Sequence, residues 1–585
     1  MIGKSVPRVD AYEKVTGRAK FTDDLVPPRC LVAKVLHATI GNGIVKSIDT
    51  SEAEALEGVV KVVTFYDVPD HCYPTPGHPW SVELAHQDVA DRNLLTGRVR
   101  YYGDDIAAVV AEDEVTASRA LKLIKVEYEE YPVVVSPKIS MRGTEHPIHL
   151  DKKDNILARS SFAIGDVDSA MEKAAVKLKR SYKTPIVQHC HIENNISYAY
   201  MEKGRIVVVS STQIPHIVRR IVGQALGIPW GQVRVIKPYV GGGFGNKQEV
   251  LYEPLNAFLT MQVGGRPVKI ELTREETFTN TRTRHSIEYD MEAGVDAEGH
   301  LLAKEMTTYS NQGAYASHGH AIAANGLTAS RLQYACPNIR GEAYTVYTNC
   351  PTAGAMRGYG IPQVCFATES FMDDIAYEIG MDPLEFRRKN LIHGYYEDAY
   401  LKPIAANTNG IFECLEKGAE YIHWDEKRKA YQNQTGDIRR GVGMALFSYK
   451  TGVWPISLEI AGARLSLNQD GSVQLQVGAT EIGQGADTVF SQMAAETLHM
   501  DISRVHIVTQ QDTDVTPFDT GAYASRQSFV TGTAVKECAQ QLKQKILEYW
   551  FQGMWTGWNW RMVIFWQMAS LRFPLRIWPW RAITV

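Results

Sequence analysis

A glycine-rich loop directly after a predicted strand constrains this chain more than any other segment. Residues 233–237, Val-Arg-Val-Ile-Lys, alternate in polarity and include β-branched side chains, which predicts a strand. The loop 241–248, Gly-Gly-Gly-Phe-Gly-Asn-Lys-Gln, follows at its end. Four of the first five loop residues lack a Cβ atom, so the backbone can adopt positive φ and approach a ligand closely. Taken alone, the loop fits a tight turn as well as a binding loop.

The loop matches neither of the two common phosphate-binding motifs. A P-loop needs Gly-Lys-Ser/Thr in sequence, whereas Asn246 separates Gly245 from Lys247. A dinucleotide-binding fingerprint needs a third glycine at the position of Gln248. If the loop binds a ligand, that ligand therefore belongs to another class.

Composition indicates an ordinary globular protein with several domains. The 585 residues are enough for two to four domains, and 44% are hydrophobic and 22% charged. A net charge of −4 gives no reason to expect nucleic acid or an anionic membrane as a partner. Charged residues interrupt the first ten positions, so we expect no secretory signal and a cytoplasmic location. The eight cysteines form no Cys-x-x-Cys pair, which favours scattered reduced thiols over a zinc or iron–sulfur site.

Periodicity predicts a small α/β module at the N-terminus, followed by longer helices between strands. The module ends near residue 132, and the polar, proline-containing segment 133–155 reads as a linker. A second change occurs near residue 406, after which Asp470-Gly471 predicts a hairpin turn. The predicted strands are 31–36, 59–65, 106–111, 125–128, 268–272, 343–347, 463–467 and 473–477, and the predicted helices are 117–124, 213–225, 362–379 and 412–422.

The tail 551–585 differs in composition from the rest of the chain. It holds six of the 11 tryptophans and contains no Asp, Glu or Lys. Its longest charge-free run, 562–571, is too short to span a bilayer, and two prolines interrupt an interfacial helix. We expect that the tail arose by out-of-frame translation from about residue 550.

Three further loops combine glycines with amide, cationic or aromatic side chains. They are Ser211-Thr212-Gln213 before a predicted helix, Ala355-Met356-Arg357-Gly358-Tyr359-Gly360, and Gly478-Ala479-Thr480-Glu481-Ile482-Gly483-Gln484-Gly485. Each alone fits a surface turn. Together they offer what a large anionic cofactor needs, namely many backbone donors, a few amides and an arginine.

A histidine-rich segment offers a metal site as an alternative. If His189-Cys190-His191-x-Glu193 were an alternating strand, His189, His191 and Glu193 would share one face and could bind zinc. Polar side chains packed at a domain seam are the commoner explanation for such a segment, and we favour it.

With these motifs in place, the chain resembles the molybdenum-binding subunits of the xanthine dehydrogenase and aldehyde oxidoreductase family. The carrying segments are GGGFGNKQ, STQ, AMRGYGIPQ and GATEIGQGADT, in the family's order. VTGRAKFTDD and YYGDDIAAVVAEDEVTASRALKLIKVEYEEYP resemble the family's N-terminal hammerhead domain. The resemblance covers about residues 5–550.

The resemblance implies an α+β, multidomain fold. A small α/β hammerhead domain (1–132) and the linker (133–155) precede a two-part molybdopterin-binding domain. Its first part is expected at 156–405 and its second part, incomplete at the C-terminus, at 406–550, before the aberrant tail 551–585.

The family's site residues carry over by motif. Beside the molybdenum, the resemblance places Gln213, Phe244, Arg357 and Ala524. In contact with the rest of the cofactor, it places Gly242, Gly243, Gly245, Gly483, Gln484, Tyr523 and Ser525. On the substrate side, it places Gln248, Asn325 and Tyr359. At Gln248 and Asn325, purine-oxidising members carry a glutamate and an arginine, so two charged substrate contacts become neutral amides here.

The implied function is hydroxylation of xanthine or hypoxanthine to urate, a step of purine metabolism and salvage. Water is the oxygen source, and electrons pass through 2Fe-2S clusters and FAD to NAD. Because this chain has no cluster or flavin motif, those groups are expected on separate iron–sulfur and FAD-binding subunits, in a heterotrimer or its dimer.

The family's general base is a glutamate in a Gly-Glu motif beyond the region matching 531–545, and no acidic residue follows Glu548. A positioned base is typically worth ~10²–10⁴ in rate, so we expect this chain to be an inactive, truncated form without a catalytic residue of its own. Two alternatives stay open: a non-catalytic scaffold that docks the partner subunits, and a hydroxylase of another heterocycle or an aldehyde.

Overall fold

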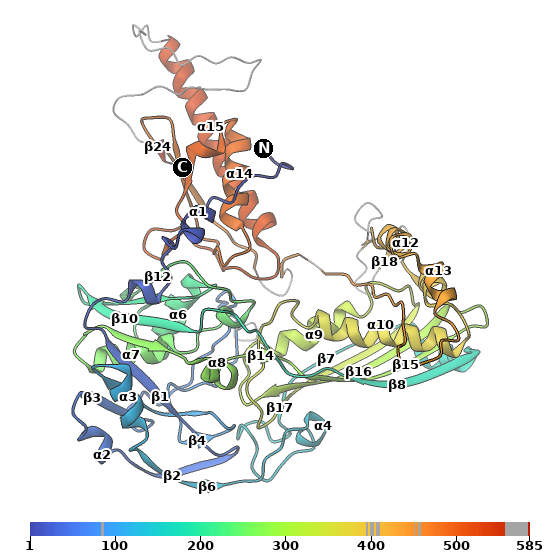
Figure 1. The fold of residues 1–585 in the computed structure, drawn as a ribbon, viewed down its shortest axis with the longest axis horizontal. Coiled ribbons are helices and arrows are strands. Elements are labelled where there is room, and N and C mark those ends of the chain that lie inside the picture. Colours follow the sequence, from blue (N-terminus) through green and yellow to red (C-terminus); the bar gives the residue numbers. More distant parts are fainter. Residues whose placement is uncertain are drawn as a thin grey trace. The chain divides into compact units, whose positions relative to one another are not determined.

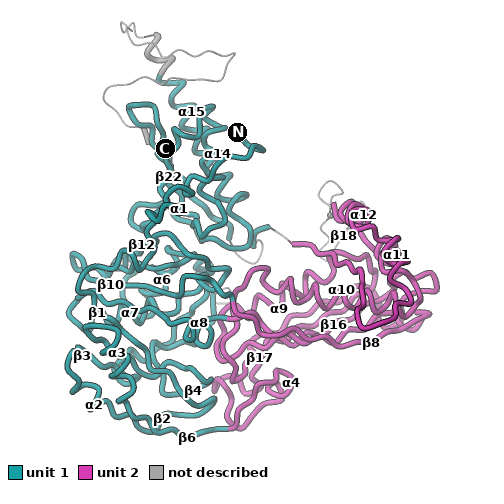
Figure 2. Tube along the Cα trace, in the orientation of Figure 1, with its two compact units in different colours: residues 1–131, 189–282, 451–585 teal, residues 132–188, 283–450 magenta. Residues whose placement is uncertain are grey.

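The computed structural model describes residues 1–83, 87–392, 396–397, 403–404, 410–449, 451–453, 458–555 and 583–584. The chain divides into two compact units, which Figure 2 colours separately. Unit 1 comprises residues 1–131, 189–282 and 451–585, and unit 2 comprises residues 132–188 and 283–450. The chain therefore passes between the units four times, and the predicted range 156–405 is shared between them.

An eight-stranded mixed sheet forms the centre of unit 1 (Figure 1). Strands of the N-terminal module lie in the same sheet as later strands, because β1 pairs in parallel with β13. In sheet order the strands are β23 (Gln511–Asp512), β12 (Val233–Lys237), β11 (Arg205–Ser210), β10 (Ile196–Glu202), β13 (Val268–Glu271), β1 (Leu31–His37), β5 (Asp105–Ala111) and β3 (Val59–Thr64). The N-terminal module is thus joined to the rest of unit 1 by backbone hydrogen bonds.

Helices α6 (Pro215–Leu226) and α7 (Glu253–Gln262) pack on this sheet and bury its apolar side chains. Proline begins α6, and Gly227 ends it at a φ of 66°, a left-handed cap that glycine adopts without strain. Helix α3 (Glu114–Leu121) packs against β1 and β5 and lies three residues earlier than predicted. The reason is Asp113, whose side chain accepts from Thr116 N–H and caps the helix.

Two smaller sheets complete unit 1. One contains β4 (Arg98–Val99), β2 (Gly43–Asp49) and β6 (Lys125–Glu130), and the other contains β22 (Val505–Ile507), β21 (Val473–Val477), β20 (Ala463–Leu467) and β24 (Ile583–Thr584). The remaining helices are α1 (Ala11–Val15), α2 (Ser51–Glu54), α8 (Arg274–Asn280), α14 (Ala486–Leu498) and α15 (Gly532–Trp555). Helix α15 continues past residue 550; most of the unusual tail lies outside the described residues.

Unit 2 is built on a five-stranded sheet in the order β7-β17-β16-β15-β8. Its strands are β7 (Ile156–Ile164), β17 (Asn338–Tyr347), β16 (Leu301–Gly313), β15 (Ile287–Val295) and β8 (Val176–Lys183). Helices α9 (Gly319–Ala329) and α10 (Ile361–Glu378) pack on this sheet and share its apolar core. The other elements are α4 (Pro137–Ser140), α5 (Val167–Lys173), β9 (Val187–Gln188), β14 (Thr283–Arg284), α11 (Pro383–Asn390), β18 (Tyr396–Glu397), β19 (Pro403–Ile404), α12 (Ile411–Ile422) and α13 (Trp424–Ala430).

The segment predicted as a linker packs against unit 2 instead of running free. Ser140 donates to the carbonyl of Tyr347 at 2.7 Å, and the buried His149 ring bonds the carbonyl of Ala314 at 2.8 Å. Its polar composition reflects side chains that satisfy buried backbone groups, which composition alone does not distinguish from exposure to water.

All eight cysteines are free thiols. In the described part of the chain, no helix has the length and apolar character needed to cross a bilayer.

Candidate functional site

Gln213 joins three separate chain segments of unit 1. Its N–H donates to the carbonyl of Lys247 at 2.8 Å, and its Oε1 accepts from Gly245 N–H at 2.9 Å. Its Nε2 donates to the carbonyl of Ala522 at 2.6 Å, while Ala522 N–H donates back to the Gln213 carbonyl at 3.1 Å. Gln213 is almost fully buried, and one hydrogen of its amide remains for another acceptor.

The glycine loop follows β12 as predicted and surrounds this amide closely. A Cβ atom at Gly243 would lie 2.5 Å from Gln213 Oε1, so any other residue there would push the Gln213 amide out of its position. Phe244 has a φ of 54°, and its side chain is 43% exposed despite its size. Within the described chain, the N–H groups of Gly242, Gly243 and Phe244 donate no hydrogen bond. Three consecutive unpaired donors next to an amide suit an anionic oxygen group.

A buried ion pair holds both ends of the glycine loop. Lys247 Nζ lies 2.7 Å from Glu193 Oε2, which also accepts from Gly241 N–H at 2.8 Å. The Lys247 side chain is fully buried, and burial lowers its pKa although the Glu193 carboxylate opposes that shift. One carboxylate thereby fixes the first and seventh residues of the loop.

The histidine-rich segment supports the loop and does not form the alternating strand that a shared zinc-binding face would require. Strand β9 ends at Gln188 and β10 begins at Ile196, and Cys190 between them has a φ of 55°, which breaks any alternation. His191 Nδ1 lies 2.6 Å from the Glu193 carbonyl, and its Nε2 lies 2.9 Å from Asn246 Nδ2. Through these hydrogen bonds, His191 and Glu193 hold the glycine loop in place.

The segment after Gly521 presents a second group of unpaired backbone donors. Ala524 and Ser525 have φ values of 51° and 53°, and in the described chain the N–H groups of Tyr523, Ala524 and Ser525 donate no hydrogen bond. The fully buried Arg526 anchors the segment to Asp519 Oδ1 at 2.6 Å. These donors adjoin Ala522, the residue that Gln213 binds.

The loop with glycines at 483 and 485 is folded around a carboxylate of its own. Gly483 N–H and Gly485 N–H donate to Oε1 of Glu481, at 2.6 Å and 3.1 Å. Gln484 accepts from Ile482 N–H at 2.7 Å and donates to the carbonyl of Thr480 at 2.9 Å. The loop is thus closed around its own carboxylate, and its predicted contacts with a cofactor remain a prediction.

In unit 2, the arginine loop brings Tyr359 together with Asn325 and His318. Asn325 Nδ2 donates to the Tyr359 carbonyl at 2.7 Å, and His318 Nδ1 lies 2.9 Å from the Tyr359 hydroxyl. Arg284 holds the Arg357 carbonyl at 2.7 Å, but the Arg357 side chain is exposed and its guanidinium has no partner within the described chain. Asn325 is thus committed partly to the loop itself.

Gln248, the remaining predicted substrate contact, lies in the short 3₁₀ turn 246–248 and is buried. Its N–H donates to the Gly245 carbonyl at 3.1 Å. Burial at the end of the glycine loop leaves the amide little access to water.

The sequence did not predict the supporting roles of three residues, Glu193, Arg526 and His318. Glu193 was considered only as a metal ligand, while Arg526 and His318 were not singled out. A charged residue beside a glycine motif, such as Arg526 after Ala522–Ser525, was the available signal. No local pattern identifies its partner Asp519 or the phenol that His318 contacts.

Family models match most of the chain. A molybdopterin cofactor-binding domain model matches residues 148–391, and a second matches residues 417–554. The aldehyde oxidase and xanthine dehydrogenase a/b hammerhead domain model matches residues 16–132. The α+β multidomain fold with these domains is confirmed, and so is molybdopterin as the cofactor of the domains.

Similar proteins point the same way. The xanthine dehydrogenase molybdenum-binding subunit of Escherichia coli O157:H7 is 49% identical over 93% of this chain and 72% of that protein. The nicotinate dehydrogenase large molybdopterin subunit of Eubacterium barkeri is 32% identical over 72% of this chain and 96% of that protein.

Among solved structures, the aldehyde oxidoreductase of Desulfovibrio gigas matches with a TM-score of 0.81 and 28% identity, over 92% of this chain and 59% of that one. The chain thus spans less than two thirds of that enzyme. By its domains, its identity to these proteins and its fold, the chain belongs to the xanthine dehydrogenase and aldehyde oxidoreductase family of molybdenum enzymes.

Proposed function

We propose that this chain is the molybdenum-binding subunit of a purine hydroxylase. It would convert xanthine or hypoxanthine to urate in the cytoplasm, with water as the oxygen source and NAD as the final electron acceptor. The observation that carries the proposal is the Gln213 junction, where unpaired donors of the glycine loop and of residues 523–525 adjoin one buried amide. The 49% identity to a xanthine dehydrogenase subunit supports the purine substrate.

The residues around Gln213 fit the oxygen-rich centre of a molybdopterin cofactor. The second amide hydrogen of Gln213 and the N–H groups of Gly242, Gly243 and Phe244 would donate to it, while Gly245 holds the Gln213 amide in place. Tyr523, Ala524 and Ser525 would donate from the other segment. Gly483 and Gln484 would contact the pterin part through the groups that the Glu481 turn leaves exposed. The bound cofactor supplies the two-electron oxidation of the substrate carbon.

For the substrate, we assign Arg357, Tyr359, Asn325 and Gln248. Arg357 offers the unpaired cation, which suits a carbonyl oxygen or a ring anion. Tyr359 offers an aromatic wall whose orientation His318 fixes through the hydroxyl. The amide oxygens of Asn325 and Gln248 would accept from ring N–H groups.

A second candidate is hydroxylation of another heterocycle or of an aldehyde. The neutral amides Gln248 and Asn325 favour it, since purine-oxidising members carry charged residues there. The relatives named for nicotinate and aldehyde substrates agree with this candidate.

Because the described chain and its sequence carry no iron–sulfur or flavin motif, we propose that FAD-binding and iron–sulfur subunits receive the electrons. A chain that docks these subunits without turnover, the scaffold alternative, would bind them without molybdenum.

Co-expression of the full chain with the genomic neighbours encoding flavin and iron–sulfur subunits tests the proposal. We expect co-purification and about one molybdenum per chain by elemental analysis, without turnover; if the assembled chain does turn over, xanthine should be oxidised faster than nicotinate or benzaldehyde. Loss of molybdenum in Gln213→Ala, but not in the control Gly231→Ala, would support the assigned site; Gly231 has open space for a Cβ. Partner binding without metal would instead support the scaffold, and any turnover would contradict the expected inactivity.

A further inference from the structure

A cavity lies within unit 1, between helix α6 and the segments 72–81 and 87–90. Its volume is about 120 Å³, enough for a small molecule. Aromatic and polar side chains line it, including Tyr73, Trp80, Asp88, Arg220 and Gln224. None of these residues has a role in the proposed hydroxylase site.

Arg220 projects from α6 into this cavity with an unsatisfied guanidinium. The residue is only 6% exposed, yet its Nε and Nη2 have no hydrogen-bond partner among the described residues. The guanidinium carbon lies 5.9 Å from the ring centroid of Trp80. Nε and Nη2 form one edge of the guanidinium, whose two parallel N–H groups match the two oxygens of a carboxylate.

The adjacent residue Arg219 shows that α6 can satisfy an arginine in the ordinary way. Its Nε donates to the Trp230 carbonyl at 3.0 Å, and its Nη1 donates to the Thr513 carbonyl at 3.1 Å. Arg220 has no such bonds although it is more deeply buried. A buried charge without hydrogen bonds is costly to the fold, so its retention points to a ligand that supplies the missing acceptors.

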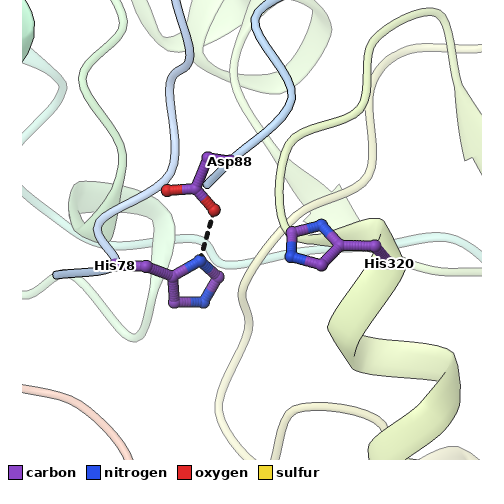
Figure 3. Close-up of side chains that lie close together, drawn as sticks. All are labelled: His78, Asp88 and His320. Atoms are coloured by element: carbon purple, nitrogen blue, oxygen red, sulfur yellow. Dashed lines mark hydrogen bonds and ion pairs between the residues drawn. The ribbon is translucent and has the colours of Figure 1, made fainter. Parts of the chain in front are cut away.

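The charged side chains near the cavity leave the Nε and Nη2 atoms of Arg220 without a hydrogen bond among the described residues. Asp88 Oδ1 lies 2.6 Å from His78 Nδ1. Figure 3 draws this hydrogen bond as a dashed line. Burial lowers the pKa of His78, but the Asp88 carboxylate outweighs it and the net pKa is raised. The same carboxylate also opposes the burial that lowers the pKa of Arg220, yet Nε and Nη2 of Arg220 have no hydrogen-bond partner among the described residues.

Gln224 adds a hydrogen-bond acceptor to the cavity, beside the guanidinium of Arg220. It lies one helical turn after Arg220 on α6, so both side chains lie on the same face. Its Oε1 is buried and has no hydrogen-bond partner among the described residues. The cavity thus offers a cationic edge, an aromatic wall and a single acceptor.

We propose that this cavity binds the carboxylate of a small monocarboxylic acid. Both oxygens accept from Nε and Nη2 of Arg220, the body of the acid lies against Trp80, and Gln224 Oε1 accepts from a hydroxyl or N–H substituent. The site is independent of the proposed hydroxylase function.

Ligand-observed NMR on the full chain tests the site, with benzoate as the probe and acetate as the competitor. We expect saturation transfer from the protein to the benzoate ring and its displacement by acetate. Arg220→Met should weaken benzoate binding about 10-fold or more, because two hydrogen bonds to a charged group are lost. The matched variant Arg219→Met should bind benzoate as the parent chain does.

Three results would overturn the proposal. They are no transfer to benzoate in the parent chain, equal binding by Arg220→Met, and displacement by inorganic phosphate as effective as by acetate. Unfolding in urea provides the folding control, since removal of an unpaired buried charge should leave the midpoint of Arg220→Met unchanged or higher. Trp80→Ala should weaken benzoate binding more than acetate binding, because only benzoate has a ring to stack.

Discussion

The glycine loop of unit 1 and the arginine loop of unit 2 share a backbone conformation but differ in which side chain is buried and which is exposed. Each places an aromatic residue at positive φ among glycines, with Phe244 at 54° and Tyr359 at 48°. In the glycine loop, the cation Lys247 is fully buried in an ion pair, and the aromatic ring is exposed. In the arginine loop, the cation is exposed and has no partner among the described residues, while the aromatic hydroxyl contacts His318.

The difference shows which part of each loop is structural. A buried, paired cation holds a backbone in place, so the glycine loop offers its N–H groups as the binding element. An exposed, unpaired cation contributes little to stability, so the arginine loop offers the side chain itself. Mutations of the two cations should therefore act on different properties.

The largest expected effect is on stability, from Lys247→Met. Glu193 would keep its buried position with only Gly241 N–H as partner, and breaking a buried pair in this way costs about 3–5 kcal/mol. Urea unfolding followed by circular dichroism measures the loss. The double variant Lys247→Met/Glu193→Gln should recover part of it, because no uncompensated charge remains; a double variant as unstable as the single one would contradict the pairing argument.

Features that depend on short segments of the sequence were predicted correctly, whereas pairings between distant residues were not. Strands β12, β20 and β21 lie within the predicted bounds to the residue, because their alternation is local and ends at glycine or polar turns. The family resemblance also placed Gln213 and the glycine loop in one site, and the structure brings them into hydrogen-bond contact; their binding of the cofactor stays a prediction.

Distant partners could not be predicted. Nothing in the sequence near Lys247 points to Glu193, 54 residues earlier, and nothing near Gly483 indicates that Glu481 would fill the turn. The interleaving of the two units has the same origin, since β1 and β13 pair across more than 200 residues. Such pairings depend on tertiary packing, which overrides local preference.

The next prediction concerns the other cation. Arg357→Gln should leave the free energy of unfolding within about 0.5 kcal/mol of that of the parent, because the exposed side chain has no partner in the described chain. If Arg357 contacts the reacting substrate, turnover by the assembled enzyme should fall about 10²–10³-fold. The two assays are run on the same preparation. A loss of stability comparable to that of Lys247→Met would show that Arg357 is also a structural cation, which would contradict the difference argued between the two loops.

A smaller effect is expected from Gly243→Ala, which tests whether the glycine loop works through its backbone. The new Cβ would lie 2.5 Å from Gln213 Oε1, so the Gln213 side chain must move and its bond to Gly245 must break. We expect a loss of about 1–3 kcal/mol in stability together with lower molybdenum content. Gly231→Ala is the control, since a Cβ there meets nothing within 4 Å. Normal metal content in Gly243→Ala would mean that the Gln213 junction is dispensable.

The smallest effect is a pH dependence that originates behind the glycine loop. Burial and the nearby charge of Lys247 lower the pKa of His191 to about 3, although its bond to the Glu193 carbonyl opposes this shift. In the neutral ring, Nδ1 donates to that carbonyl and Nε2 accepts from Asn246; a proton on Nε2 would oppose the Asn246 N–H.

An unfolded chain has an ordinary histidine with a pKa near ~6.5, so below that pH the unfolded state binds a proton that the folded state does not. Stability from this residue is therefore complete above about pH 6.5 and decreases as the pH falls toward 3, by about 1 kcal/mol between pH 6.5 and 5.5. Asp487 changes in the opposite sense in this range, because burial raises its pKa to about 6.

The difference between the parent chain and His191→Gln isolates the histidine, because both contain Asp487. Glutamine keeps an acceptor for Asn246 without a titrating group, so its unfolding free energy should decrease less than that of the parent over this interval. Parallel pH curves for the two chains would show that His191 is protonated in the folded state. The protonated ring would then be a second cation beside Lys247. The two cations would repel each other and destabilise the glycine loop, with the Glu193 carboxylate as their counter-charge.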